Sequence, residues 1–292
     1  MSTQPTGSRH SLEFPINRLA YPQDDLDHTL SAPWMKLTDK RLLITGANGW
    51  FGSWLCAAVS HAKAEIELTK IGRGDNFPDG DFDYVIHAAP AMTKEVLDFA
   101  AARNVRRFLY VSSGVARNGS VQGRHNAYAE MKRADEALCN ASPLKPVIAR
   151  CFSFVGPGQQ LDGHWAIGNF LADATSGKNI MVKGDGSAIR SWMHMADLVV
   201  WLVTLLIKAE RGCTYNVGSE EATSIAALAD KVAAIAGTNV RILGKPSGPD
   251  YYVPSTIAAQ ELGLDTRIRL DSAITRTYAW ILGQKTLAKE MA

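Results

Sequence analysis

A glycine-marked turn between an apolar strand and an apolar helix constrains this chain more than any other feature. The segment RLLITG (41–46) is predicted to be a short buried strand, and ANGWFGSWLCAAVSHA continues directly into a helix. Gly46, Gly49 and Gly52 have the spacing G-x-x-G-x-x-G. The first glycine permits a tight turn, the second lets backbone approach a pyrophosphate, and the third lets helix and strand pack closely. Turn glycines without a ligand are the alternative, but the flanking strand and helix favour a nucleotide site.

Strands and helices alternate along the first half of the chain. Further strands are predicted at residues 64–71, 82–89, 105–113 and 146–156, with helices at 93–104 and 128–140. Such alternation is typical of a parallel sheet with helices on both faces. We therefore predict an α/β protein with a Rossmann-like, doubly wound parallel sheet and a smaller, mixed α/β C-terminal lobe.

The expected organisation has three parts. Residues 1–40 form an N-terminal extension that packs on the rest. Residues 41–157 form an NAD(P)-binding domain, to which 192–218 return, and residues 158–292 form a substrate-binding lobe.

Composition excludes several classes of protein. The 292 residues are 46% hydrophobic with a net charge of +2, which gives no reason to expect a nucleic acid or an anionic membrane as partner. The longest apolar run, at 198–207, is half the length needed to span a bilayer. The first residues lack the apolar core of a signal peptide. The four cysteines are scattered, which suits a reducing cytosol and predicts neither disulfides nor a metal site: Cys56, Cys139, Cys151 and Cys213. We expect a soluble, cytoplasmic protein.

A tyrosine and a lysine lie one helical turn apart in NAYAEMK. At this spacing Tyr128 and Lys132 share one face of the predicted helix. A lysine ammonium there could lower the pKa of the phenol and prepare it to exchange a proton. Taken alone, the pair could equally be one turn of an ordinary solvated helix.

Several motifs occur in the order seen in short-chain dehydrogenases/reductases. The glycine turn is followed by VIHAA, YVSS, the Tyr-x-x-x-Lys pair, RCFSFVGPG, GDGSAIRSWMHMADL and YNVGS. Over about residues 41–285 the chain resembles the extended branch of that class, the NAD-dependent epimerase/dehydratase family, which modifies nucleotide sugars.

The resemblance implies a catalytic set of Ser113, Tyr128 and Lys132. In the family the Tyr exchanges a proton with a sugar hydroxyl, and the Lys holds the nicotinamide ribose and lowers the Tyr pKa. The Ser hydroxyl binds the reacting oxygen. Hydride transfer from an alcohol carbon needs such a proton acceptor on the oxygen.

The resemblance also implies a cofactor site for NAD, with NADP as the alternative. The implied cofactor contacts are Gly46, Asn48, Gly49, Trp50, Phe51, Gly52, Asp75, His87, Ala88, Ala89, Tyr128 and Lys132. His87 could equally be a satisfied core histidine. No acid ends the second strand, and Lys70 and Arg73 could either meet a 2′-phosphate or remain solvated.

The implied partner is a nucleotide diphosphate sugar. Arg190 matches the family's arginine that clamps the diphosphate, which suits its charged fork. Asn169 resembles an asparagine near the nucleotide, and Ser153 stands where the family has asparagine. The helices at 92–103 and 128–139 would form a homodimer face.

Residues after the Ser motif bear on the reaction. Related dehydratases and decarboxylases place an acid there, whereas this chain has Gly114 and Val115. We therefore expect a nucleotide-sugar epimerase. A 4-ketoreductase would need the same three residues and stays open, with dehydratase a further alternative. The non-enzymatic alternative is a dinucleotide-binding regulatory relative with trimmed loops, against which the intact Ser–Tyr–Lys set argues.

Overall fold

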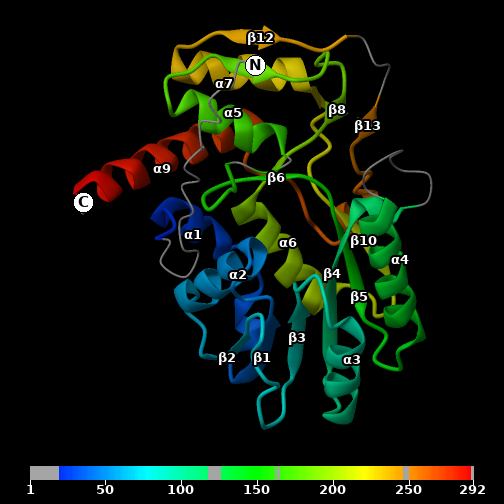
Figure 1. The fold of residues 1–292 in the computed structure, drawn as a ribbon. Coiled ribbons are helices and arrows are strands. Elements are labelled where there is room, and N and C mark those ends of the chain that lie inside the picture. Colours follow the sequence, from blue (N-terminus) through cyan, green and yellow to red (C-terminus); the bar gives the residue numbers. More distant parts are fainter. Residues whose placement is uncertain (1–19, 118–125, 162, 164, 246–249, 291–292) are drawn as a thin grey trace, which may run out of the picture.

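A six-stranded parallel sheet forms the centre of the molecule. The structure is a computed structural model that describes residues 20–117, 126–161, 163, 165–245 and 250–290. The strand order is β10-β5-β4-β3-β1-β2 (Figure 1). The strands are β1 (Lys40–Thr45), β2 (Ile66–Ile71), β3 (Tyr84–His87), β4 (Arg107–Ser113), β5 (Val147–Cys151) and β10 (Thr214–Val217). All five pairings between neighbours are parallel.

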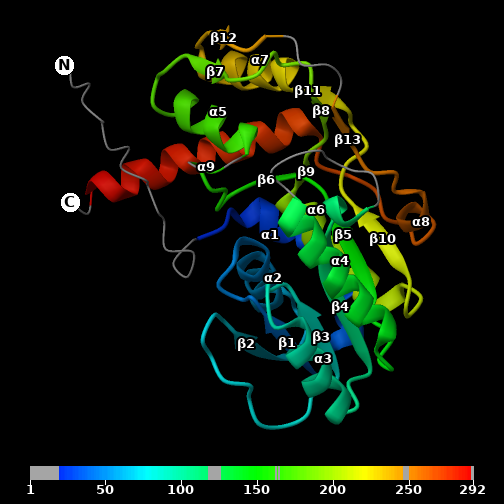
Figure 2. The same cartoon turned by 45° about the vertical axis from the view of Figure 1, so that its right-hand side comes forward.

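Helices cover both faces of this sheet (Figures 1 and 2). The helices α2 (Trp50–His61) and α6 (Met195–Lys208) lie on one face, and α3 (Thr93–Ala102) and α4 (Asn126–Ala141) lie on the other. Successive side chains of a strand point to opposite faces, so Leu42 and Leu43 belong to different cores. The predicted doubly wound parallel sheet is therefore confirmed.

Helix α6 contains the longest apolar run of the sequence. It packs on β4 and β5, and nearly all its side chains are buried. In the part of the chain that the structure describes, no helix combines the length and the apolar composition that crossing a membrane requires.

The strand predicted at 146–156 is wrong in its second half. β5 ends at Cys151, and a separate strand β6 (Phe154–Val155) pairs with β9 (Met193–His194) in another sheet. The reason is a change of hydrogen-bond partner. The Phe152 N–H still donates to Val217, whereas the Ser153 carbonyl accepts from Met193.

The remaining elements lie beyond the carboxyl edge of the central sheet (Figure 1). They are α5 (Ala166–Ala174), β7 (Ile180–Val182), β8 (Ile189–Arg190), β11 (Thr223–Ser224), α7 (Ile225–Ala236), β12 (Val240–Ile242), β13 (Tyr251–Tyr252), α8 (Ile257–Gln260) and α9 (Leu270–Glu290). Small sheets of order β11-β8-β13 and β12-β7 form here. The division of the chain into domains at residue 157 stays a prediction.

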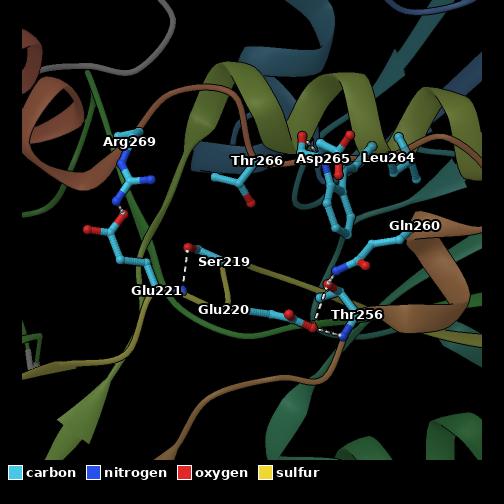
Figure 3. A pocket seen from close by; sticks show the side chains of 10 residues that line it. Ser219, Glu220, Glu221, Thr256, Gln260, Leu264, Asp265, Thr266 and Arg269 are labelled. Carbon is cyan, nitrogen blue, oxygen red and sulfur yellow. Dashed lines mark hydrogen bonds and ion pairs between the residues drawn. The ribbon is translucent and has the colours of Figure 1, made fainter.

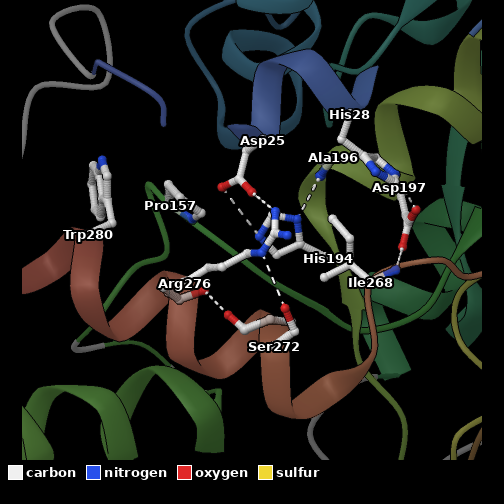
Figure 4. Close-up of polar contacts among 12 residues, drawn as sticks. Asp25, His28, Pro157, His194, Ala196, Asp197, Ile268, Ser272, Arg276 and Trp280 are labelled. Atoms are coloured by element: carbon white, nitrogen blue, oxygen red, sulfur yellow. Dashed lines mark hydrogen bonds and ion pairs between the residues drawn. The ribbon is translucent and has the colours of Figure 1, made fainter. Parts of the chain in front are cut away.

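An N-terminal segment joins α6 and α9 through buried polar contacts (Figure 4). It contains α1 (Gln23–Thr29) and a short helix, Trp34–Leu37. The Asp25 carboxylate pairs with Arg276 of α9 at 2.7 Å, and His28 pairs with Asp197 of α6 at 2.7 Å. Residues 1–19 of the predicted extension lie outside the described residues.

Candidate active site

The glycine turn lies at the carboxyl edge of β1, against the segment that follows β3. Gly46 has φ +73°, and a Cβ there would lie 2.7 Å from the backbone of Ala88 and Ala89. A Cβ on Gly52 would lie 2.1 Å from the Gly46 carbonyl oxygen. At Gly49 the nearest atom would be 3.2 Å away. The fold therefore requires glycine at 46 and 52, whereas a Cβ at position 49 would make one tight contact with the Gly46 carbonyl oxygen.

Helix α2 begins at this turn with its backbone donors uncapped. Gly49 is the N-cap residue, and no side chain caps the helix. The Trp50 indole donates to the Pro157 carbonyl at 2.8 Å, and the Phe51 ring packs edge-on against Phe154. These two side chains therefore face β6 and the residues that follow it, and contact of their backbone with a cofactor stays a prediction.

The loop that follows β2 contacts the glycine turn. The Asp75 carboxylate accepts the Gly72 N–H at 2.7 Å, and a Cβ on Gly72 would lie 2.2 Å from the Asn48 side-chain nitrogen. Asn48 and Asp75 are thus brought together beside the turn. Lys70 and Arg73 are both exposed nearby, which leaves both readings of them open.

His87 is bound entirely by protein groups. Its Nδ1 lies 2.6 Å from the Thr45 hydroxyl and its Nε2 lies 3.2 Å from the Thr93 hydroxyl. Burial, with a smaller effect of the Lys132 charge, lowers its pKa to about 3. The structure favours the core-histidine interpretation for this side chain, while its backbone leads into Ala88 beside the turn.

The three predicted catalytic residues lie at the carboxyl end of β4 and on the facing side of α4. Burial raises the pKa of the Tyr128 phenol, and a hydrogen bond with the Ser113 side chain lowers it in part. The Tyr128 side chain remains 43% exposed. The Lys132 ammonium donates instead to the Tyr110 hydroxyl at 3.0 Å and to the Val111 carbonyl at 3.2 Å. The structure brings Ser113 and Tyr128 together, whereas the Lys132 ammonium is buried against β4, bound to Tyr110 and Val111.

A buried ion pair fixes α4 against the sheet. Glu136 accepts the Ser112 hydroxyl at 2.5 Å and the Arg150 guanidinium at 2.6 Å. These contacts join α4 to β4 and β5, and so they set where Tyr128 and Lys132 stand.

Tyr252 enters this site from β13, which the sequence did not predict. A Cβ on Gly114 would lie 2.6 Å from the Tyr252 hydroxyl, and the Tyr252 ring packs against Phe152 in a tilted arrangement, with 4.7 Å between ring centroids. Burial raises the pKa of Tyr252, against a lowering hydrogen bond with Ser113. The phenol fills the space that a side chain at position 114 would need. Only the pairing of β13 with β8, which sequence pattern does not reveal, brings it there.

The predicted substrate residues are engaged with other parts of the protein. Arg190 forms an ion pair with Asp250 and donates to its carbonyl at 2.9 Å. The Asn169 side chain donates to the carbonyls of Gly163 and Trp165, both at 3.1 Å. Ser153 is buried at the switch between β5 and β6. An anionic ligand at Arg190 would therefore share that guanidinium with Asp250.

A separate pocket of about 330 Å³ lies between α6, the segment after β10 and α8 (Figure 3). Its polar side chains bind one another. Glu220 accepts from the Thr256 backbone and hydroxyl, and the Trp201 indole donates to the Asp265 carbonyl. None of the predicted site residues lines it.

Similarity to known proteins agrees with this arrangement. Residues 80–218 match the model of the NAD dependent epimerase/dehydratase family. A dTDP-glucose 4,6-dehydratase from an Actinoplanes species is 29% identical over 206 residues, covering 64% of each chain. UDP-glucuronic acid decarboxylase 1 from Arabidopsis thaliana is 30% identical over 162 residues, covering 53% of this chain and 37% of that one. The chain thus spans less than two thirds of the length of these relatives.

Solved structures share the fold along most of the chain. The epimerase Mth375 from Methanothermobacter thermautotrophicus has a TM-score of 0.74 at 21% identity, covering 92% of this chain and 98% of its own. Bordetella bronchiseptica WbmF, solved with NAD+ and UDP, has a TM-score of 0.72 at 21% identity, covering 88% and 96%. The parallel sheet and its glycine turn define a short-chain dehydrogenase/reductase fold. Within that class, residues 80–218 are similar to the NAD-dependent epimerase/dehydratase family, and the curated relatives above are similar over longer stretches.

Proposed function

We propose that this protein is an NAD(P)-dependent nucleotide-sugar epimerase that acts by transient hydride transfer, with Tyr128 as acid and base. One observation carries the proposal. The Ser113–Tyr128 pair stands at the carboxyl end of β4, on the same edge of the sheet as the glycine turn after β1, and the neighbouring positions Gly114 and Val115 supply no acid.

The residues present fit a dinucleotide. Gly49 offers a backbone surface without a side chain, and the first turn of α2 has no side-chain cap. Backbone N–H groups at a helix N-terminus are suited to a pyrophosphate. A bound nicotinamide ring would accept a hydride and return it. Ala88 and Ala89 would line the cofactor site, and Asn48 and Asp75 would lie beside it.

Side chains of the protein would then accept and return the proton of the sugar hydroxyl. Tyr128 takes the proton of a sugar hydroxyl as that carbon becomes a carbonyl, and it returns the proton when the hydroxyl forms again with the other configuration. Ser113 holds the reacting oxygen. Lys132 holds the nicotinamide ribose and favours the phenolate by its charge.

Two other reactions compete with epimerisation. The named relatives include dehydratases and decarboxylases, which favours water loss or decarboxylation as the second candidate. Against it, Tyr252 occupies the space where an acid at position 114 would stand. A 4-ketoreductase uses the same three residues, so product analysis must distinguish it.

The substrate would be a nucleotide diphosphate sugar bound through Arg190. The guanidinium is in place at the end of β8, and its partner Asp250 keeps it oriented. A homodimer stays a prediction, and the exposed Met131 and Leu138 on α4 support it.

Cofactor binding is tested first, by titration with NAD and with NADP. Gly49→Val should abolish binding, because its side chain would occupy the approach of the pyrophosphate. Its Cβ would lie 3.2 Å from the Gly46 carbonyl oxygen, so circular dichroism and urea denaturation must first show that the variant is folded. Gly184→Ala is the matched control, because a Cβ there would have no neighbour within 4 Å. Gly177 is unsuitable, because its φ of +66° would strain an alanine. Unchanged affinity in Gly49→Val would contradict the dinucleotide site.

Substrate class is tested by thermal shift with UDP-, dTDP-, GDP- and CDP-sugars in the presence of dinucleotide. A ligand that binds only the native state stabilises it by RT ln(1 + [L]/Kd), so the melting temperature rises with the logarithm of ligand concentration once the site is nearly saturated. Any stabilising sugar is then incubated with enzyme, and its products are analysed by NMR. An inverted hydroxyl supports the epimerase. A 6-deoxy-4-keto product identifies a dehydratase, and conversion that requires reduced cofactor identifies a ketoreductase. Dinucleotide binding with no sugar shift would favour the regulatory relative.

A further inference from the structure

We infer that Tyr110 and Asp135 are positioning residues for Lys132. They form a buried hydrogen-bonded chain that fixes the lysine ammonium and keeps it charged, so that it presents a donor to a ligand. The inference rests on the proposed function for the role of Lys132 in catalysis. The chain of contacts itself stands on the geometry alone.

The direction of the hydrogen bonds is determined by a single hydrogen. The Tyr110 hydroxyl donates to the Asp135 carboxylate at 2.7 Å, which uses its one hydrogen. Its oxygen must therefore accept from the Lys132 ammonium, 3.0 Å away. The Val111 carbonyl accepts a second Lys132 hydrogen at 3.2 Å. An ammonium has three hydrogens, so one is left over for a ligand or for a neighbouring side chain.

The protonation state of Lys132 decides whether it offers a ligand a hydrogen-bond donor or only a lone pair. If the lysine is charged, its third N–H donates to a ribose hydroxyl or to Tyr128. If it is neutral, both its hydrogens are used by Tyr110 and Val111, and only a lone pair faces the ligand. A lone pair would neither bind a phenolate nor favour its formation.

Lys132 is 3% exposed, and burial lowers its pKa, with Asp135 the largest opposing influence. Other groups face it from α4, β3 and β5, but they carry no free negative charge. Glu136 is paired with Arg150. The Cys139 and Cys151 thiols have pKa values raised by burial, and His87 has its pKa lowered to about 3. Among the described residues, Asp135 is therefore the carboxylate that can compensate Lys132.

Tyr110 is rigid enough to transmit this effect. Its ring stacks on His87 with 5.6 Å between centroids, and His87 is held by Thr45 and Thr93. The Lys132 ammonium also lies 4.9 Å from the Tyr110 ring centre, within the range of a cation–π contact. The hydroxyl is thus fixed between the lysine and the carboxylate.

The test is an NMR titration of the full-length protein labelled with [ε-13C]lysine, with the Lys132 resonance assigned through Lys132→Arg. Asp135→Asn keeps an acceptor for Tyr110 and removes the charge. It should lower the Lys132 titration midpoint by about one pH unit or more, the usual effect of losing a nearby opposite charge. Asp135→Glu should restore the wild-type midpoint. Glu130→Gln, an exposed acid on the same helix, is the matched control and should leave it unchanged.

Tyr110→Phe provides the second arm. It should also lower the midpoint, and the Tyr110→Phe/Asp135→Asn double variant should shift it less than the sum of the two single shifts, because both act on one chain. An unchanged midpoint in Asp135→Asn, or an equal shift in Glu130→Gln, would overturn the inference.

Dinucleotide affinity gives a separate readout. Above its lowered midpoint, Asp135→Asn should bind dinucleotide more weakly than wild type, while Glu130→Gln should not. If wild type binds no dinucleotide and converts no sugar, the proposed function fails, yet the NMR titration still decides whether Asp135 and Tyr110 control Lys132.

Discussion

Two buried polar networks in this molecule look alike in composition and differ in what they leave unsatisfied. The Lys132 network, made of Lys132, Tyr110 and Asp135, has hydrogen bonds of 2.7 to 3.2 Å and leaves one hydrogen of the ammonium unused. The His194 cluster joins α1, α6 and α9, and it contains His194, Asp25, His28, Asp197 and Arg276 (Figure 4). The hydrogen bonds of the first network leave one lysine hydrogen unused, whereas the second contains buried atoms that lack a hydrogen bond.

The His194 cluster contains two buried atoms without hydrogen bonds. They are the Asp25 Oδ2 and the His194 Nε2, which lie 3.7 Å apart. The His194 Nδ1 accepts the Ala196 N–H at 3.2 Å, so a neutral ring carries its proton on Nε2, toward Asp25. Burial lowers the pKa of His194 to about 3 and raises that of Asp25. Arg276, not His194, is therefore the charge partner of Asp25 at neutral pH.

The comparison predicts that damage to the His194 cluster affects stability alone, and this is the largest effect we expect. Arg276→Met should lower the free energy of unfolding by about 3 kcal/mol, because it leaves a buried carboxylate unpaired. Urea denaturation would measure the loss. Dinucleotide affinity of the folded protein should stay within twofold of wild type. A tenfold loss of affinity would show that the two networks are coupled.

Damage to the active site should do the reverse. Tyr128→Phe should reduce turnover by about a hundredfold or more, equivalent to roughly 2.7 kcal/mol in the barrier, because the proton then has no positioned acceptor. Its free energy of unfolding should change by less than about 0.5 kcal/mol, since the phenol is partly exposed. Steady-state kinetics with an identified sugar would measure the first effect. A wild-type rate in this variant would remove Tyr128 from the mechanism.

Acid should destabilise the protein through its buried histidines. The folded-state pKa of His194 is about 3, below the ordinary value near 6.5, so between these values the unfolded chain binds more protons. Stability from this group is complete above about pH 6.5 and declines as pH falls toward 3, by at most about 1.4 kcal/mol per unit. Asp25 opposes this, because its raised pKa favours the folded state at lower pH.

His194→Asn should flatten that decline, and an asparagine can still cap α6. Urea denaturation at pH 6 and pH 5 gives the slope for each protein. His87 behaves like His194, with its pKa also near 3, so part of the slope should persist in the variant. Equal slopes in the two proteins would mean that His194 does not titrate as argued.

Local pattern was enough to predict the central sheet, because its signals are local. Apolar strands bounded by a glycine turn or by polar helices show their period in a few residues, as at β1 and β4. The break after Cys151 could not be seen, since the sequence stays apolar while the hydrogen-bond partner changes from Val217 to Met193. Short strands that pair far along the chain, such as β8 with β13, leave no local period either.

The candidate site divides in the same way. Ser113, Tyr128 and Lys132 follow from motifs within one strand and one helix, and their role stays a prediction. Asp135 could have been suspected, because it lies three residues after Lys132 on the same helix face. Tyr252 and Asp250 could not, because they arrive through a strand pairing with β8.

Substitution of Tyr252 should give the smallest effect. It tests whether the C-terminal lobe contributes to the active site or only to stability. Tyr252→Phe keeps the ring packed against Phe152 and removes only the hydroxyl that lies beside Gly114 and Ser113. We expect a loss of about 0.5 kcal/mol in the free energy of unfolding, the low end for one hydrogen bond. Turnover should fall severalfold, because Ser113 loses one of the two phenols that orient its hydroxyl, while dinucleotide affinity should not change. Kinetics and urea denaturation on the same preparation would separate the two effects. If only stability fell, Tyr252 would have a purely structural role, as we expect of the residues of the His194 cluster.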